Sequence, residues 1–316
     1  MKNFAITGVA GYIAPRHLQA IKSTNNRLVA ALDPHDSVGI LDKFTYDVSF
    51  FSEFERFDRF LEKLKRTNRP DKIDFLSICA PNYLHDAHIR MGFRVGADAI
   101  CEKPLVLKPS NLDAIELLEE EYQKKVYNIL QLRVHPKIVE LKKRYAGPQK
   151  SKHNIVLTYI TSRGLWYKYS WKGNDEKSGG VVTNIGIHFF DMLMWIFGKP
   201  QENYVFLRDD NRASGFLELE NANVRWYLSI DHNDLPKIAT DKNQSTYRSI
   251  LFDEEEIEFT DGFTDLHTDI YKDILNGGGF GIKEARPSIE TVHQIRNSTI
   301  SIKDDLLHPF LTQIKH

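Results

Sequence analysis

The stretch Phe4-Ala5-Ile6-Thr7-Gly8-Val9-Ala10-Gly11-Tyr12-Ile13-Ala14 decides the fold of this chain. Its first four residues predict a short buried strand, and the two glycines predict a tight turn. Pro15 suits the first turn of a helix, which we expect to reach about Lys22. Such a turn lets backbone N–H groups and the positive end of a helix dipole approach a pyrophosphate. The stretch therefore predicts a dinucleotide site, with contacts from Gly8, Gly11, Tyr12 and Ile13.

A carboxylate follows the next apolar run. Residues 28–32 predict a second strand, and Asp33 comes directly after it, 25 positions beyond Gly8. A carboxylate there accepts hydrogen bonds from the ribose diol of NAD and repels the ribose phosphate of NADP. The alternative is that Asp33 caps a helix or a turn. The pattern favours NAD as the cofactor.

Apolar runs and amphipathic stretches alternate up to about residue 125. A strand is expected over residues 73–79, a helix over 85–95 and a further strand ending at Lys103. Repeated strand–helix–strand units require a mostly parallel sheet. The fold predicted for residues 1–127 is an α/β Rossmann domain that binds NAD.

The run Ile100-Cys101-Glu102-Lys103-Pro104 ends an apolar stretch on a lysine and a proline. Ligands of open α/β sheets bind outside the carboxyl ends of the strands, so Lys103 is the first candidate for chemistry. Other residues at this edge are predicted to contact the cofactor: Pro81, Asn82, His85 and Glu102. For His85 the alternative is that it caps or packs its own helix.

Residues 128–316 have a different character. Strand-like runs at 154–161, 222–230 and 247–252 stand among helical stretches. They predict an α+β domain on a largely antiparallel sheet, which binds substrate or joins subunits. Gly277 to Gly279 predict a turn before a helix from Ile282 to Ile300.

A dense polar cluster lies in this second domain. The glycines at 179 and 180 and Asn184 precede an apolar helix in which His188 and Asp191 share one face. A histidine in such a helix is either a hydrogen-bonded core residue or an acid–base group. Because the glycines and Asn184 place it at a helix start, we take His188 as a second candidate for catalysis.

Composition excludes several classes of function. The formal net charge is -1 and no basic block is present, so neither nucleic acid nor an anionic membrane is an expected partner. No leader or long uncharged apolar run is evident, and Cys79 and Cys101 stand in strand-like runs as buried thiols. No Cys/His group has metal-ligand spacing. We expect a cytoplasmic protein without a bound metal.

Four motifs in order carry a resemblance to a known family. Gly11-Tyr12-Ile13-Ala14-Pro15-Arg16-His17, Pro81-Asn82-Tyr83-Leu84-His85, Glu102-Lys103-Pro104 and Gly186-Ile187-His188-Phe189-Phe190-Asp191 resemble the Gfo/Idh/MocA family of NAD(P)-dependent sugar oxidoreductases. The resemblance implies that Lys103 and His188 are the active-site pair. Which of them is the base stays open. The first glycine turn differs from the usual family pattern by one extra residue between Gly8 and Gly11.

Within that family, the runs 15–17, 159–164, 170–173 and 183–186 resemble bacterial enzymes that oxidise UDP-N-acetylglucosaminuronate at C3 in O-antigen synthesis. The resemblance implies a UDP-sugar acid as substrate, reoxidation of NADH by 2-oxoglutarate and a homotetramer. The alternatives are another sugar or cyclitol dehydrogenase of the family, or a redox-inert NAD-sensing protein.

A nucleotide-sugar acid carries a diphosphate and a carboxylate, so its pocket needs cationic donors. Arg163, Lys172 and Arg248 are the candidates, each with a solvated or structural cation as the alternative. Asn184 either binds a sugar hydroxyl or caps the His188 helix. Trp171 and Tyr247 complete the predicted substrate contacts, with packing as the alternative for the aromatic loop around Trp171.

Overall fold

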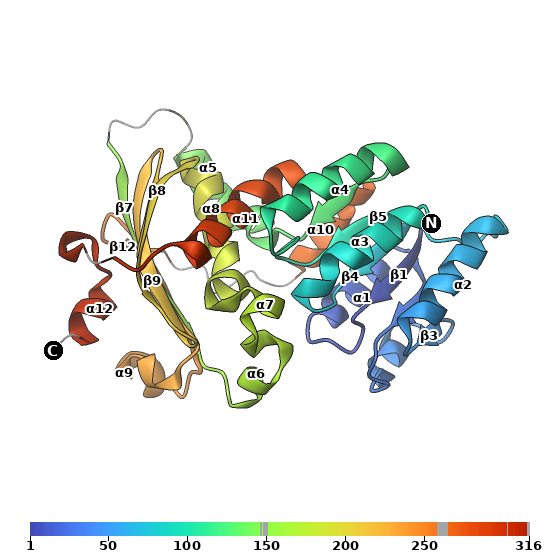
Figure 1. Cartoon of the computed structure of the whole chain (residues 1–316), viewed down its shortest axis with the longest axis horizontal. Helices are drawn as coiled ribbons and strands as arrows, with labels where there is room; N and C mark the ends of the chain where they lie inside the picture. The colour runs from blue at the N-terminus through green and yellow to red at the C-terminus, as the bar shows by residue number, and fades with distance from the viewer. Residues whose placement is uncertain (146, 148–150, 258–264, 302, 315–316) are drawn as a thin grey trace. The chain divides into compact units, whose positions relative to one another are not determined.

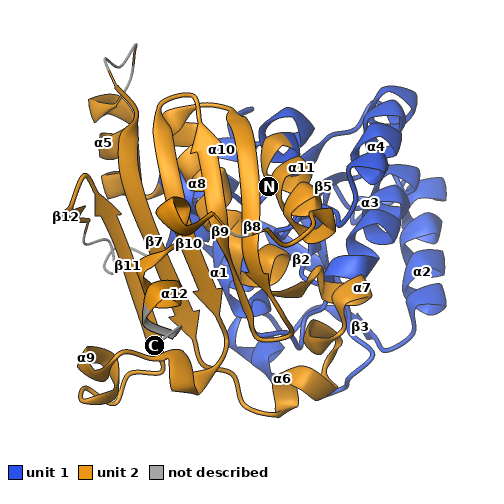
Figure 2. Cartoon of the chain, turned by 60° about the vertical axis from the view of Figure 1, so that its left-hand side comes forward, with its two compact units in different colours: residues 1–134, 264–286 blue, residues 135–263, 287–316 orange. Residues whose placement is uncertain are grey.

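The structure, a computed structural model, describes residues 1–145, 147, 151–257, 265–301 and 303–314. The chain forms two compact units, coloured separately in Figure 2. Unit 1 comprises residues 1–134 and 264–286, and unit 2 comprises residues 135–263 and 287–316.

Unit 1 is built on a six-stranded parallel sheet (Figure 1). Its strands are β1 Asn3–Thr7, β2 Arg27–Leu32, β3 Ser49–Phe51, β4 Phe75–Ile78, β5 Asp98–Cys101 and β6 Val126–Asn128. The strand order is β3-β2-β1-β4-β5-β6, which is the doubly wound order of the Rossmann fold. The order reverses between β1 and β4, and ligands bind at such a switch point. The predicted parallel sheet is therefore confirmed.

The helices of unit 1 cover this sheet. They are α1 Ala14–Ser23, α2 Phe54–Arg66, α3 His85–Arg94, α4 Pro109–Tyr122 and α10 Leu266–Leu275, with short 3₁₀ turns η1 Gly39–Lys43, η2 Asn82–Leu84 and η3 Gln131–Val134. In α2 the buried residues Phe57, Leu61 and Leu64 recur at helical spacing, which gives that helix one apolar stripe. Hydrophobic burial thus fixes the helices on a sheet whose strands are themselves buried.

The two units do not follow the single boundary after residue 127 that the sequence predicts. The apolar stripe of α10 packs into the core of unit 1, where Ile270, Tyr271 and Ile274 join Phe4 and Leu18. The chain thus returns to unit 1 after residue 263. The second boundary falls within α11 (Ile282–Asn297), beside Pro287.

Unit 2 is built on a six-stranded sheet in the order β12-β11-β7-β10-β9-β8. Its strands are β7 His153–Thr161, β8 Pro200–Arg208, β9 Arg212–Leu219, β10 Ala222–Ser229, β11 Thr246–Phe252 and β12 Glu255–Glu256. All neighbouring strands are antiparallel except β7 and β10, so the predicted largely antiparallel sheet is confirmed.

The helices of unit 2 are α5 Pro136–Arg144, α6 Trp166–Tyr169, α7 Asp175–Ser178, α8 Ile187–Phe197, α9 Lys237–Thr240, α12 Pro309–Ile314 and part of α11, with the short turns η4 Trp171–Gly173, η5 Val182–Gly186, η6 His232–Asp234 and η7 Asp304–Leu306. The run Asp175–Phe197 has the length and mean hydropathy (1.4) of a membrane span. Because 78% of its apolar window is buried inside the structure, it has the environment of a core helix.

Candidate active site

The glycine turn after β1 is shaped for close approach of a ligand. Gly8 has φ +77°, and a Cβ there would lie 2.5 Å from the backbone carbonyl group of Cys79. Among the described residues, the structure gives no hydrogen-bond acceptor to the backbone N–H groups of Tyr12 and Ile13 at the start of α1. Two donors at a helix start suit a pyrophosphate, so the turn fits a dinucleotide.

We expect Gly8→Ala to lower the free energy of unfolding by about 3 kcal/mol or more, because the new methyl group meets backbone and the residue keeps a left-handed φ. Urea unfolding of both variants measures this. Gly39→Ala is the matched control, since a Cβ at Gly39 has no neighbour within 4 Å among the described residues. Equal stabilities of the two variants would contradict the expectation.

Asp33 follows β2 directly, as predicted, and its side chain is buried. One carboxylate oxygen accepts the N–H of Ala10 at 2.9 Å, and the other accepts the N–H of His35 at 2.9 Å. Asp33 therefore does cap the glycine turn. Each oxygen keeps a further lone pair, so the carboxylate also fits the ribose diol of NAD.

We expect Asp33→Asn to weaken NAD binding about tenfold and to reduce discrimination against NADP, because the amide keeps one acceptor but loses the charge that repels a ribose phosphate. Dissociation constants for both cofactors measure this. An unchanged ratio of the two constants would leave Asp33 with the capping role alone.

The residues after β4 are tied to those after β5. His85 is fully buried, and its Nδ1 and Nε2 lie 2.7 Å and 2.8 Å from the carbonyl oxygens of Pro104 and Ala80. Burial lowers the pKa of His85, although these carbonyl groups oppose the shift. A neutral ring donates to one of the two oxygens. These contacts support the alternative that His85 packs within unit 1, next to the segment that carries Lys103. The predicted cofactor contacts of His85, Pro81 and the buried Asn82 stay predictions.

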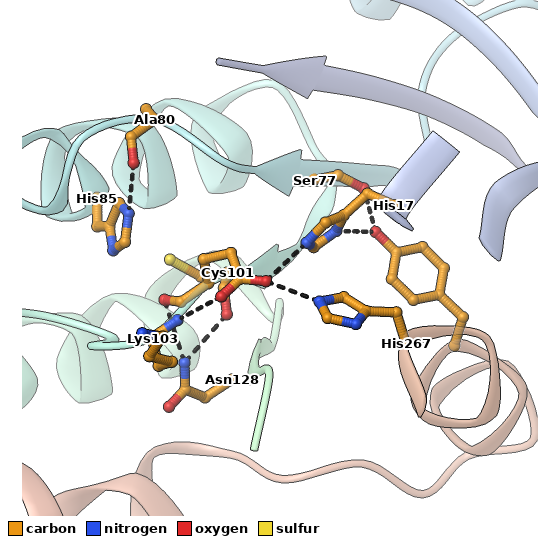
Figure 3. A network of polar contacts seen from close by, with 10 residues as sticks. His17, Ser77, Ala80, His85, Cys101, Lys103, Asn128 and His267 are labelled. Carbon is orange, nitrogen blue, oxygen red and sulfur yellow. Dashed lines mark hydrogen bonds and ion pairs between the residues drawn. The ribbon is translucent and has the colours of Figure 1, made fainter. Parts of the chain in front are cut away.

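Lys103 stands where predicted, two positions beyond the end of β5, and is half-buried. Its backbone N–H donates to Oε2 of Glu102 at 3.2 Å. The side-chain amide of Asn128 donates to the carbonyl oxygens of Cys101 (3.0 Å) and Glu102 (3.3 Å). Figure 3 shows Lys103 and Asn128 side by side. The backbone around Lys103 is thus fixed by hydrogen bonds with the side chains of Glu102 and Asn128.

The sequence missed two partners of Glu102. Oε1 of Glu102 lies 3.0 Å from Nε2 of His17 and 2.9 Å from Nε2 of His267. Both histidines are buried, on α1 and α10 (Figure 3). Burial alone would raise the pKa of Glu102, but the hydrogen bonds from the two histidines hold it well below its ordinary value. The side chain predicted to contact the cofactor is therefore engaged within unit 1.

In unit 2, His188 is the second residue of α8 and is half-buried. The start of α8 is not an open helix end, however. Residues 180–186 are already helical, with a π-type turn over Val182–Gly186 that runs directly into α8. Asn184 lies inside this turn, and its amide donates to the hydroxyl of Tyr167 at 2.5 Å instead of capping the helix.

A basic and aromatic cluster stands on the loop after β7. The ammonium group of Lys172 lies 4.5 Å from the ring centroid of Trp171 and 5.8 Å from that of Trp166. Burial lowers the pKa of Lys172, and the nearby charge of Arg163 adds to this. The structure therefore brings together Arg163, Trp171 and Lys172, and their predicted contact with an anionic ligand stays a prediction.

The pleat of β11 separates Tyr247 from Arg248. The guanidinium group of Arg248 lies over the rings of Tyr159 and Phe189, 5.5 Å and 5.8 Å from their centroids. Tyr247 packs instead against a cluster that includes Ile160 and Tyr227. Arg248 is thus placed beside Phe189, the neighbour of His188, whereas the predicted contact of Tyr247 with the substrate stays a prediction.

Comparison with known proteins identifies the family. Residues 2–129 match the family model GFO_IDH_MocA, described as an oxidoreductase family with an NAD-binding Rossmann fold, and residues 153–243 match the model of its C-terminal α/β domain. The chain belongs to the Gfo/Idh/MocA oxidoreductase family.

This Gfo/Idh/MocA chain is similar to solved structures along nearly all of its length. The WlbA (WbpB) dehydrogenase from Thermus thermophilus in complex with NAD and α-ketoglutarate is 48% identical, with a TM-score of 0.94, covering 98% of this chain and 100% of that one. The same enzyme in complex with NAD and UDP-GlcNAcA has a TM-score of 0.93 at the same identity and coverage. WlbA from Bordetella pertussis, 17% identical with a TM-score of 0.75 over 95% of this chain and 97% of that one, shows the shared fold.

Among curated proteins, the D-glucoside 3-dehydrogenase of Escherichia coli is 27% identical over 135 residues, which are 41% of this chain and 37% of that protein. The 2,7-anhydro-N-acetylneuraminate hydratase of Mediterraneibacter gnavus is 26% identical over 207 residues, which are 63% of this chain and 50% of that protein. The chain thus matches half or less of the length of these curated relatives.

Proposed function

We propose that this chain oxidises the C3 hydroxyl of UDP-N-acetylglucosaminuronate to a 3-keto sugar, with NAD as the cofactor, on the route to diacetamido uronic acids of O-antigen. The observation that carries the proposal is the 48% identity, over 98% of the chain, to a dehydrogenase whose complexes hold NAD and this sugar nucleotide. The glycine turn and Asp33 support NAD binding, because their geometry fits a dinucleotide.

The residues that we propose for the chemistry are Lys103 of unit 1 and His188 of unit 2. NAD, when bound, accepts the hydride that leaves C3. Lys103 stabilises the negative charge that develops on the sugar oxygen, and His188 accepts its proton, or the two exchange these roles. The fixed backbone around residues 101–103 supports a well-oriented lysine, which matters because orientation supplies much of the rate.

Recognition of the substrate is proposed for the basic cluster of unit 2. Arg163 and Lys172 would pair with the diphosphate or the uronate carboxylate, and Trp171 would offer a ring to the sugar or the uracil. Arg248 and Asn184 would bind polar groups of the sugar. These roles suit the depressed pKa of Lys172, because a partly buried ammonium group that also lies near a second cation gains from an anionic ligand.

Reoxidation by 2-oxoglutarate is part of the proposal. The bound NADH would pass its hydride to the keto carbon of 2-oxoglutarate, which with a proton becomes 2-hydroxyglutarate and restores NAD. The complex of the Thermus thermophilus relative with NAD and α-ketoglutarate supports this step.

We also propose that the protein is a homotetramer and that it is located in the cytoplasm. The buried free thiols of Cys79 and Cys101 suit a reducing compartment. Native mass spectrometry measures the number of subunits.

The test is mass spectrometry of UDP-N-acetylglucosaminuronate after incubation with the protein and NAD, with and without 2-oxoglutarate. We expect the sugar nucleotide to lose two hydrogens and 2-hydroxyglutarate to form in the second tube. An unchanged sugar nucleotide in both tubes would reject the substrate. Free sugars and cyclitols would then be tested for NAD reduction.

A further inference from the structure

The hydrogen bonds around Glu102 fix where the protons lie. An ionised carboxylate only accepts, so Nε2 of His17 and Nε2 of His267 both carry protons. Burial lowers the pKa of His17, which favours its neutral ring. Nδ1 of His17 is then an acceptor for the hydroxyl of Tyr271, 2.7 Å away, and that hydroxyl accepts from Ser77, also at 2.7 Å. Donation therefore runs in one direction, from Ser77 to Glu102.

This chain of contacts joins four elements of unit 1. Ser77 lies on β4, His17 on α1, His267 and Tyr271 on α10, and Glu102 follows β5. All these side chains are buried, and a buried carboxylate is costly unless donors compensate for lost water. The two imidazole donors provide this compensation at a single oxygen, Oε1. Oε2 remains for a different partner.

That partner is the catalytic candidate itself. Oε2 of Glu102 accepts the backbone N–H of Lys103, while the N–H of Glu102 donates to the carbonyl oxygen of Ile78 at 3.0 Å. The amide of Asn128 holds the carbonyl oxygens of residues 101 and 102. The position of the Lys103 backbone therefore depends on a carboxylate whose own orientation is set by helices α1 and α10.

His17, Glu102 and His267 also offer three possible metal-ligand atoms within 4.8 Å of one another. Both imidazole Nε2 atoms, however, contact the same carboxylate oxygen at ordinary hydrogen-bond distances of 2.9–3.0 Å. Protons on the two nitrogens account for these contacts, and they leave the carboxylate charge available to the lysine N–H.

We propose that Glu102 is a positioning residue for Lys103: its carboxylate, oriented by His17 and His267, fixes the Lys103 peptide N–H and thereby aims the lysine at the reacting hydroxyl. The inference rests on the proposed function for the reaction it serves. The proposal also gives a role to α10, which belongs to unit 1 although it lies late in the sequence: its His267 orients the carboxylate of Glu102.

The test is Glu102→Gln. The amide keeps the shape of the side chain but has one acceptor oxygen, so either the histidines or the Lys103 N–H face an NH₂ group. We expect kcat to fall about 10- to 100-fold, while KM for the sugar nucleotide and Kd for NAD change about twofold or less.

Glu119→Gln is the matched control, because Glu119 is also a carboxylate of unit 1 that accepts one backbone N–H, that of Val126. It should leave kcat unchanged. An unchanged kcat in Glu102→Gln, with wild-type turnover intact, would overturn the proposal and leave the function standing.

A variant that keeps the charge covers the case in which Glu102→Gln does not fold. His267→Phe removes one donor but retains the edge-on ring contact with His17; we expect kcat to fall about 3- to 10-fold with Kd for NAD unchanged. No change in kcat would overturn the proposal. A stoichiometric metal in the wild type that is lost from His267→Phe would also overturn it.

Crystal structures separate this proposal from the proposed function, because they need no turnover. In Glu102→Gln or His267→Phe with NAD, we expect the Lys103 peptide and ammonium group to shift or to lose order relative to the wild type. Lys103 in an unchanged position would overturn the positioning role. Failure of the wild type to oxidise the sugar nucleotide would reject the function, and the crystal structures would still decide the role of Glu102.

Discussion

Replacement of Lys103 by methionine is expected to lower kcat about 10³- to 10⁴-fold, the largest effect of any single change that leaves the fold intact. Methionine has a similar length but no charge or proton to offer to the sugar oxygen. The backbone N–H of Lys103 that donates to Glu102 is retained in the variant. Steady-state kinetics with the sugar nucleotide, and NAD binding by fluorescence titration, measure the effect.

Lys108→Met is the matched control for this prediction. Lys108 is an exposed lysine five positions further on, so the same chemical change there should leave kcat unaffected. Lost turnover with intact affinity for NAD in Lys103→Met would also argue against a redox-inert NAD sensor. Turnover within tenfold of the wild type would remove Lys103 from the chemistry.

His188→Asn is expected to lower kcat about 10²- to 10³-fold, because asparagine can hydrogen-bond the sugar hydroxyl but cannot take its proton near neutral pH. The pH profile of kcat/KM should lose one ionisation in the variant. His293→Asn, the same change on α11 of unit 2, serves as control and should leave the profile unaltered. If His188→Asn retained both the rate and the profile, Lys103 would be the base without help from His188.

The parts of the fold that the sequence predicts are those determined by local pattern. The strand before Gly8, the helix after it and Asp33 at the end of β2 follow from residues within about thirty positions of one another, and the structure has each of them. Lys103 at the end of β5 was likewise predictable, since a charged residue and a proline end an apolar run visibly.

The rest depends on contacts that are distant in sequence. His17 and His267 are 85 and 165 positions from Glu102, and each looks like an ordinary histidine of an amphipathic helix. The apolar stripe of α10 predicts that this helix is buried, but it does not predict whether the helix packs in the core of unit 1 or of unit 2. The β8–β9 hairpin was missed because β8 carries polar residues over its first half. Asn184 was misjudged because the helical segment already begins at Gly180, so that Asn184 lies inside it, in a π-type turn, and not at its start.

The proposed reaction requires that a hydride leaves C3 of the sugar. The most direct measurement uses UDP-N-acetylglucosaminuronate carrying deuterium at C3, incubated with the protein and NAD and followed by mass spectrometry of sugar and cofactor. We expect the deuterium to leave the sugar, to appear on the nicotinamide and to pass to C2 of 2-hydroxyglutarate when 2-oxoglutarate is added. Reduction of NAD with the deuterium still on the sugar, or no reduction at all, would contradict it.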